Sequence, residues 1–101
     1  MPKFIVVAKT EEIISGQCHT VEVEGKQITV FNVDGNYYAL DDNCVHRGGP
    51  LGQGNFEENT ITCPWHAWKF DVTTGTCLTN PIAKATSYQT KIEGTNVLIN
   101  C

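Results

Sequence analysis

Two short motifs that pair a cysteine with a histidine constrain this chain more than any other feature of its sequence. Cys44 and His46 are separated by one residue, and Cys63 and His66 by two. Sixteen residues lie between His46 and Cys63, so the two pairs can come from neighbouring loops and present four side chains at one point. Because the chain has only three histidines, two such pairs would rarely arise by accident. The pattern therefore predicts a metal site.

Thiolate and imidazole ligands suit zinc, copper and iron–sulfur centres. A structural zinc site usually takes two cysteines from one turn and two histidines from a helix. Here each motif supplies one residue of each type, and no helix is expected after His66. The other candidate is a [2Fe–2S] cluster in which two imidazoles replace two thiolates. At this point the motifs leave both candidates open, the cluster and a zinc-stabilised β binding module.

Composition and length indicate one small globular domain over residues 1–101. Hydrophobic residues make up 41% of the chain and charged residues 18%, which is typical of a folded protein. The net charge is −4 and the basic residues are dispersed singly, so nucleic acid is not an expected partner. No apolar run is long enough to span a membrane, and the run at 4–8 is too short for a signal peptide.

Without a membrane span or a signal peptide, we expect a soluble cytoplasmic protein. Five cysteines, an odd number, in such a reducing compartment indicate ligands and thiols rather than a disulfide framework. Cys18, Cys77 and Cys101 have no partner motif, and we expect them to remain thiols.

Short strands separated by turn residues predict an all-β fold. Residues 19–23 and 88–92 alternate apolar and polar side chains, which is typical of strands with one buried face. On this pattern Ile92 belongs to the buried face. Residues 26–33 and 96–100 are more continuously apolar, and we expect them to be better buried.

Three local signals refine this pattern. Asp34-Gly35 predicts a tight hairpin between 26–33 and the strand that follows. A single helical turn is expected near residues 10–14, with Thr10 as its N-cap and Gly16 as its stop. The β pattern ends at Asp42, and strands resume at Ser87. Together these signals predict a small antiparallel β domain with a loop-rich insert at about 42–81.

The two motifs with their flanks, C-V-H-R-G-G-P-L (44–51) and C-P-W-H-A-W-K-F-D-V-T-T-G (63–75), are similar to the two cluster-binding loops of Rieske proteins. Over nearly the whole chain the sequence resembles the small Rieske-type ferredoxins that serve multicomponent ring-hydroxylating oxygenase systems. The resemblance implies an antiparallel Rieske-type β domain, with the insert binding one [2Fe–2S] cluster per chain.

The same resemblance implies the ligands and the role. Cys44 and Cys63 would hold one iron, and His46 and His66 the other. The protein would be a monomeric one-electron carrier, which takes electrons from a separate NAD(P)H-dependent reductase and passes them to a terminal Rieske oxygenase. A small Rieske-fold subunit of an assimilatory nitrite reductase is the alternative function.

Residues near the ligands acquire expected roles from the family pattern. Gly48 and Gly49 would allow the backbone to approach the cluster closely. Trp65 and Trp68 would cover it, with ordinary core aromatics as the alternative, which applies more to Trp68 than to Trp65 because Trp65 lies between two ligands. Pro81 resembles part of a third covering loop.

Missing residues narrow the function further. The catalytic partners of Rieske ferredoxins hold a second iron with two histidines and a carboxylate, and only His19 remains here beyond the two motifs. No glycine-rich nucleotide-binding motif is present. We therefore expect an electron carrier without catalytic residues of its own.

The sequence also separates this chain from the high-potential Rieske proteins of cytochrome bc-type complexes. Those proteins have an extra cysteine in each cluster loop, where this chain has Gly49 and Trp65. They also have a serine and a tyrosine that donate hydrogen bonds to the cluster sulfurs, where this chain has Trp68 and Phe70. The differences favour the ferredoxin type.

Overall fold

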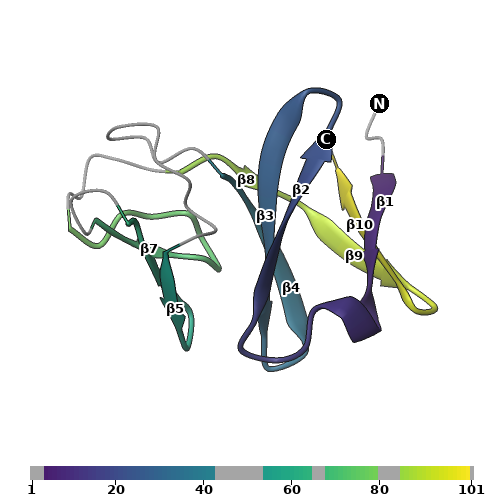
Figure 1. The fold of residues 1–101 in the computed structure, drawn as a ribbon, viewed down its shortest axis with the longest axis horizontal. Helices are drawn as coiled ribbons and strands as arrows, with labels where there is room; N and C mark the ends of the chain where they lie inside the picture. Colours follow the sequence, from purple (N-terminus) through teal and green to yellow (C-terminus); the bar gives the residue numbers. More distant parts are fainter. Residues whose placement is uncertain (1–3, 43–53, 65–67, 80–84, 101) are drawn as a thin grey trace.

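The computed structural model describes residues 4–42, 54–64, 68–79 and 85–100. This part of the chain forms three antiparallel sheets (Figure 1). Their strands are β1 Phe4–Lys9, β2 Cys18–Val23, β3 Lys26–Val33, β4 Asn36–Asp41, β5 Asn55–Glu57, β6 Thr60–Thr62, β7 Lys69–Asp71, β8 Ser87–Tyr88, β9 Thr90–Glu93 and β10 Asn96–Asn100. The predicted all-β, antiparallel fold is confirmed.

The central sheet has the strand order β2-β3-β4-β8 and lies between the other two sheets (Figure 1). On one of its faces Val30 packs with Val97 and Ile99 of the outer sheet, β1-β10-β9. On the other face, Phe31 and Leu40 pack against the small sheet, β5-β6-β7. Because both faces of β3 are covered, its apolar run is continuous rather than alternating. The predicted bounds of this strand and of β10 match the structure.

The predicted β3–β4 hairpin is also confirmed. Val33 pairs with Asn36 across a two-residue turn. Both turn residues have a positive φ, 52° at Asp34 and 89° at Gly35, as a type I′ turn requires. Asn32 supports the turn, because its side-chain oxygen accepts a hydrogen bond of 2.8 Å from the N–H of Gly35.

The helical turn is shorter than predicted, and its N-cap lies one residue earlier. It is a 3₁₀ helix, η1, over Thr10–Glu12, and its N-cap is Lys9 rather than Thr10. The N–H of Lys9 donates a 2.7 Å hydrogen bond to the Glu12 carboxylate. This contact closes the first turn from Lys9, so Thr10 is the first helical residue and not the cap.

The expected single strand at 88–92 is divided between two sheets. Tyr88 ends β8 of the central sheet, whereas Thr90 begins β9 of the outer sheet. The prediction that Ile92 is buried is wrong, since 44% of its surface is exposed. The strand β9 is an edge of the outer sheet, and a strand with one neighbour leaves more of its side chains uncovered.

The insert contains regular structure that the sequence pattern did not predict. The small sheet lies entirely within the predicted insert, and each of its strands has three residues. Strands of this length are too short to show a hydrophobic period. The described part of the insert is therefore a folded platform and not only loops.

Candidate metal centre

Of the four predicted ligands, the structure describes only Cys63. The other three, and most of the residues expected to surround them, lie outside the described residues: Cys44, His46, Gly48, Gly49, Trp65, His66 and Pro81. Among the described residues, no group of three or more His, Cys, Asp or Glu side chains is placed to hold a metal. Three segments of the chain carry these residues: 43–53, 65–67 and 80–84. The described residues on either side show where each segment is attached.

Cys63 directly follows β6 and is almost fully buried, with 1% of its surface exposed. It packs in a core that includes Ile61 and Phe70 of the small sheet. Its backbone N–H donates a 2.7 Å hydrogen bond to the carbonyl oxygen of Trp68. This bond continues the β6–β7 ladder by one pair, so His66 lies in a short connection whose two ends are held together.

One end of the small sheet receives the chain from both predicted ligand motifs. Asn55, the first residue of β5, pairs with Thr62, the last residue of β6, which in turn pairs with Lys69, the first residue of β7. We call this row the ligand end. The chain therefore enters the sheet at the ligand end through Gly54, and it leaves β6 there through Cys63.

The segment that carries Pro81 begins at the same place. After β7 the chain turns back beside that strand, with an isolated bridge between Phe70 and Cys77. The N–H of Leu78 donates to the carbonyl of Lys69 at 2.7 Å, and the N–H of Lys69 donates to Oγ1 of Thr79 at 3.0 Å. Thr79, the last described residue before segment 80–84, therefore lies at the ligand end.

The described residues before segment 43–53 and after segment 80–84 are also neighbours. The N–H of Asp41 donates to the carbonyl of Thr86 at 2.8 Å, just before segment 43–53 and just after segment 80–84. The N–H of Ala85 donates to the carbonyl of Gly75 at the same distance. The fold therefore holds Asp41 beside Thr86, and Ala85 beside the turn at Gly75 that follows β7.

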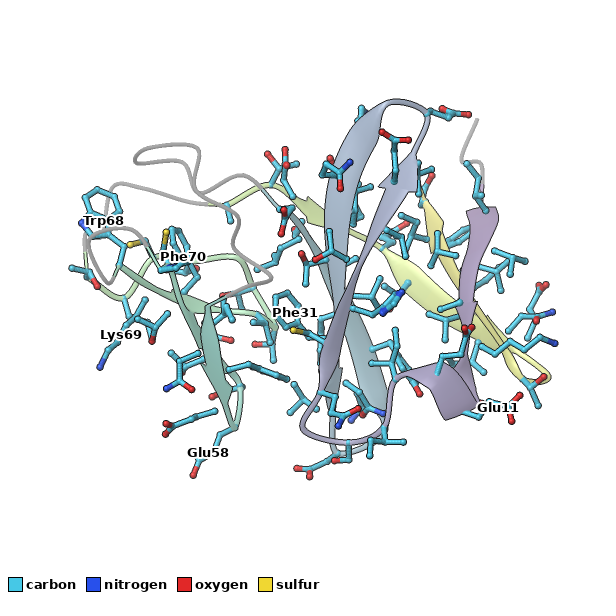
Figure 2. The ribbon with its side chains drawn as sticks, viewed as in Figure 1. Glu11, Phe31, Glu58, Trp68, Lys69 and Phe70 are labelled. Carbon is cyan, nitrogen blue, oxygen red and sulfur yellow. The ribbon has the colours of Figure 1, made fainter. Side chains whose placement is uncertain are left out.

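Aromatic side chains lie along the small sheet near this end. Figure 2 shows Trp68 and Glu58 at opposite ends of the small sheet, with Phe70 nearer the core. Trp68 is half-buried and packs against the core that contains Cys63, whereas Phe70 is fully buried. An ordinary core aromatic would make the same contact, so the covering role of Trp68 stays a prediction. Phe70 offers no hydroxyl.

Cys18 differs from Cys63 in its surroundings. It begins β2 opposite Phe31, in the central sheet, and is half-buried. Burial raises the pKa of the Cys18 thiol, and the nearby Asp42 charge raises the pKa further. A raised pKa favours the neutral thiol over the thiolate that a metal requires, which supports the prediction that Cys18 remains a thiol.

These observations fit a Rieske-type site. Cys63 presents its sulfur in an apolar, water-poor core, and the segments that carry the other sulfur and both imidazoles attach at the same end. Residues 3–95 match the Rieske [2Fe-2S] domain family, and the chain belongs to that family.

Several relatives of the chain are ferredoxin components of dioxygenase systems. The chain is 35% identical over 99 residues to the ferredoxin component of the naphthalene 1,2-dioxygenase system of Pseudomonas putida, with coverage of 97% of this chain and 95% of the relative. It is 29% identical to the biphenyl dioxygenase ferredoxin subunit of Pseudomonas sp. strain KKS102, with coverage of 96% and 91%. The predicted resemblance to oxygenase-type Rieske ferredoxins is confirmed.

Solved structures agree with the fold. The ferredoxin of carbazole 1,9a-dioxygenase from Nocardioides aromaticivorans IC177 superposes with a TM-score of 0.89 at 26% identity, covering 99% of this chain and 97% of that one. The Sphingomonas yanoikuyae B1 ferredoxin gives a TM-score of 0.89 at 27% identity, with coverage of 98% and 99%. In the described part of the chain, no helix is long and apolar enough to cross a bilayer.

Proposed function

We propose that this protein is the one-electron carrier of a ring-hydroxylating oxygenase system. The relatives at 35% and 29% identity are ferredoxins of naphthalene and biphenyl dioxygenases. Similar solved structures include complexes of an oxygenase with a ferredoxin. The carrier accepts an electron from a separate NAD(P)H-dependent reductase and delivers it to a terminal Rieske oxygenase. It works as a single-domain monomer over residues 1–101, in the cytoplasm, and catalyses no reaction itself.

The proposed cofactor is one [2Fe–2S] cluster per chain, with Cys44 and Cys63 on one iron and His46 and His66 on the other. The cluster supplies the chemistry of the carrier, because it accepts and releases one electron at a time. The observation that carries this proposal is the shared attachment of the two ligand-bearing segments at the ligand end of the small sheet.

The described residues contribute the environment of the site. The hydrogen bond between Cys63 and Trp68 fixes the backbone on either side of His66. Burial of Cys63 keeps water from its sulfur, and solvent access is one of the factors that set the potential of such a centre. The half-buried Trp68 covers the same core from the ligand end.

Anaerobic titration of the purified protein with dithionite tests the function. We expect a coloured protein that contains two irons and two sulfides and takes up about one electron per chain. A colourless protein that contains zinc and takes up no electron would support the β binding module instead. A coloured protein that is soluble only together with a large enzyme subunit would support the nitrite reductase alternative.

A further inference from the structure

A chain of hydrogen bonds crosses the central sheet and ends on Asp42. The hydroxyl of Thr29 donates to Oδ1 of Asp42 at 2.6 Å. The hydroxyl oxygens of Thr20 and Thr29 are 3.0 Å apart. A hydroxyl has a single hydrogen, and that of Thr29 is directed to Asp42, so Thr20 is the donor in the second bond. The chain therefore runs from Thr20 through Thr29 to the carboxylate.

The inner part of this chain is buried. Thr29 is fully buried, and Asp42 exposes 8% of its surface. A carboxylate in such a place is costly unless donors compensate for the lost water. Besides the Thr29 bond, the backbone N–H of Asp42 donates to the carbonyl of Gln27 at 2.9 Å. Asp42 is thus fixed to β3 through both its side chain and its backbone.

The chain lies on the face of the central sheet that meets the small sheet. Thr29 pairs with Leu40 on one side and with Thr20 on the other, and directly paired residues project from the same face. Leu40 belongs to the core that includes Cys63 and Phe70. Asp42 is therefore held on the side of the sheet where the proposed cluster lies.

Asp42 is also the last described residue before the segment with two proposed ligands. Cys44 follows it by two residues, and two residues of chain span at most about 7 Å. So short a connection can absorb little movement of its anchor. Any shift of Asp42 would be passed on to Cys44, and then to His46.

We propose that Thr29 and Asp42 are positioning residues for the cluster: their hydrogen bond fixes Asp42, the last described residue before Cys44 and His46. The inference rests on the ligand set proposed above. If this hydrogen bond served only to stabilise the fold, it would hold the sheet together without affecting the cluster. The two roles can be separated by measurements on the cluster itself.

The test compares holoprotein variants by the rate at which iron passes to the chelator ferrozine and by the visible circular dichroism of the oxidised cluster. Thr29→Val removes the donor and keeps the shape of the side chain. We expect about tenfold faster iron release, the factor set by one lost hydrogen bond to a charged group, and an altered dichroism spectrum. Thr29→Ser keeps the hydroxyl, so its rate of iron release and its dichroism spectrum should be close to those of the wild type. Thr20→Val removes only the outer bond and should change little.

Gly35→Ala is the matched stability control. Gly35 has a φ of +89° and lies in the turn of the β3–β4 hairpin, at the opposite end of β4 from Asp42. The Gly35→Ala substitution should lower the melting temperature without altering the rate of iron release. The inference is overturned if Thr29→Val releases iron at the wild-type rate, or if Gly35→Ala accelerates release as much as Thr29→Val does.

Two further outcomes are also decisive. If Thr29→Val does not fold, Asp42→Asn carries the test, because it keeps the shape and weakens the bond; it should speed iron release, and an unchanged rate overturns the inference. A wild-type protein without iron would overturn the proposed function together with this inference. If the wild type contains the cluster and the variants release iron at the wild-type rate, the inference about Thr29 and Asp42 is overturned and the proposed function is not.

Discussion

Phe31 of β3 and Phe56 of β5 pack edge to face, with ring centroids 5.0 Å apart and ring planes at 64°. This pair joins the central sheet to the small sheet. Phe31 is fully buried in the core that contains Cys63, and Phe56 packs against that core from outside. An aromatic pair of this kind contributes roughly 0.5–1.5 kcal/mol beyond its buried area. The orientation of the platform that carries Cys63 therefore depends on a contact with the central sheet.

Phe56→Leu should weaken the packing of the small sheet against the central sheet while leaving the central and outer sheets intact. We expect the free energy of unfolding to fall by about 1–2 kcal/mol, because the ring contact and part of the buried area are lost. Amide hydrogen exchange should accelerate in β5–β7 more than in β1 and β10. Equal acceleration in all three sheets would show that the pair does not hold the small sheet separately.

Gly75 should tolerate no side chain. Its φ is +82°, and a Cβ there would lie 2.6 Å from the carbonyl oxygen of Ala85, so the backbone would have to move. Gly75→Ala should lower the free energy of unfolding by about 3 kcal/mol, from left-handed strain and overpacking together. Gly25 has the same φ with nothing within 4 Å, so Gly25→Ala should cost only about 1 kcal/mol. Equal losses in urea unfolding would contradict the clash.

His66→Ala should abolish the cluster, because no other side chain of its segment can replace the imidazole. Iron and sulfide analysis of the purified variant should find neither, and the protein should be colourless. His19→Ala is the matched control, since His19 is exposed on β2 of the central sheet and should leave both intact. Two irons and two sulfides in the His66→Ala protein would refute the ligand assignment.

Cys18 should react slowly with alkylating agents at neutral pH. The thiolate is the reactive form, and burial followed by the Asp42 charge raises the pKa of Cys18 above its ordinary value of 9.0. The pH of half-maximal alkylation, followed by mass spectrometry, should therefore be higher for Cys18 than for a cysteine in a short unstructured peptide. Asp42→Asn should lower that pH by removing one of the two causes. A wild-type midpoint equal to that of the peptide would contradict the assignment.

The same shift predicts a pH dependence of stability. The folded state holds the Cys18 proton more tightly than the unfolded state, so its contribution is complete below the unfolded pKa and is lost as pH rises through the folded pKa. The free energy of unfolding of the wild type should thus decrease above about pH 9 relative to Cys18→Ser. A constant difference between the two proteins across this range would show that Cys18 does not titrate as described.

The sequence predicted the strands that have a strong local signal. Residues 26–33 are apolar throughout, and Asp34-Gly35 specifies a type I′ turn, so β3 and its hairpin could be located correctly. Strands β5–β7 could not, because each is three residues long and is stabilised by pairing and by the core under Phe70 rather than by its own pattern. Ile92 was misplaced because the alternation of 88–92 cannot show that the chain changes sheets within it.

The candidate site also has some features that could be predicted from the sequence and others that could not. The ligand types and their spacing are local and predicted a metal site, and the resemblance of the two motifs to the Rieske family predicted the kind of centre before the fold was known. The buried bond between Thr29 and Asp42 joins residues 13 apart in the chain, and neither residue carries a motif. Only the register of β3 against β4 brings them together, so no reading of the sequence alone could have found this pair.

The midpoint potential tests the central claim most directly, namely that the chain carries a Rieske cluster tuned for an oxygenase ferredoxin. Rieske centres span about −150 to +300 mV, and hydrogen bonds to the sulfurs raise the potential because they favour the more negative reduced state. Phe70 is fully buried and has no hydroxyl to donate, so the potential should be low. Voltammetry at pH 7 should show one reversible one-electron wave near −150 mV. A wave above about +100 mV, or none, would contradict the account.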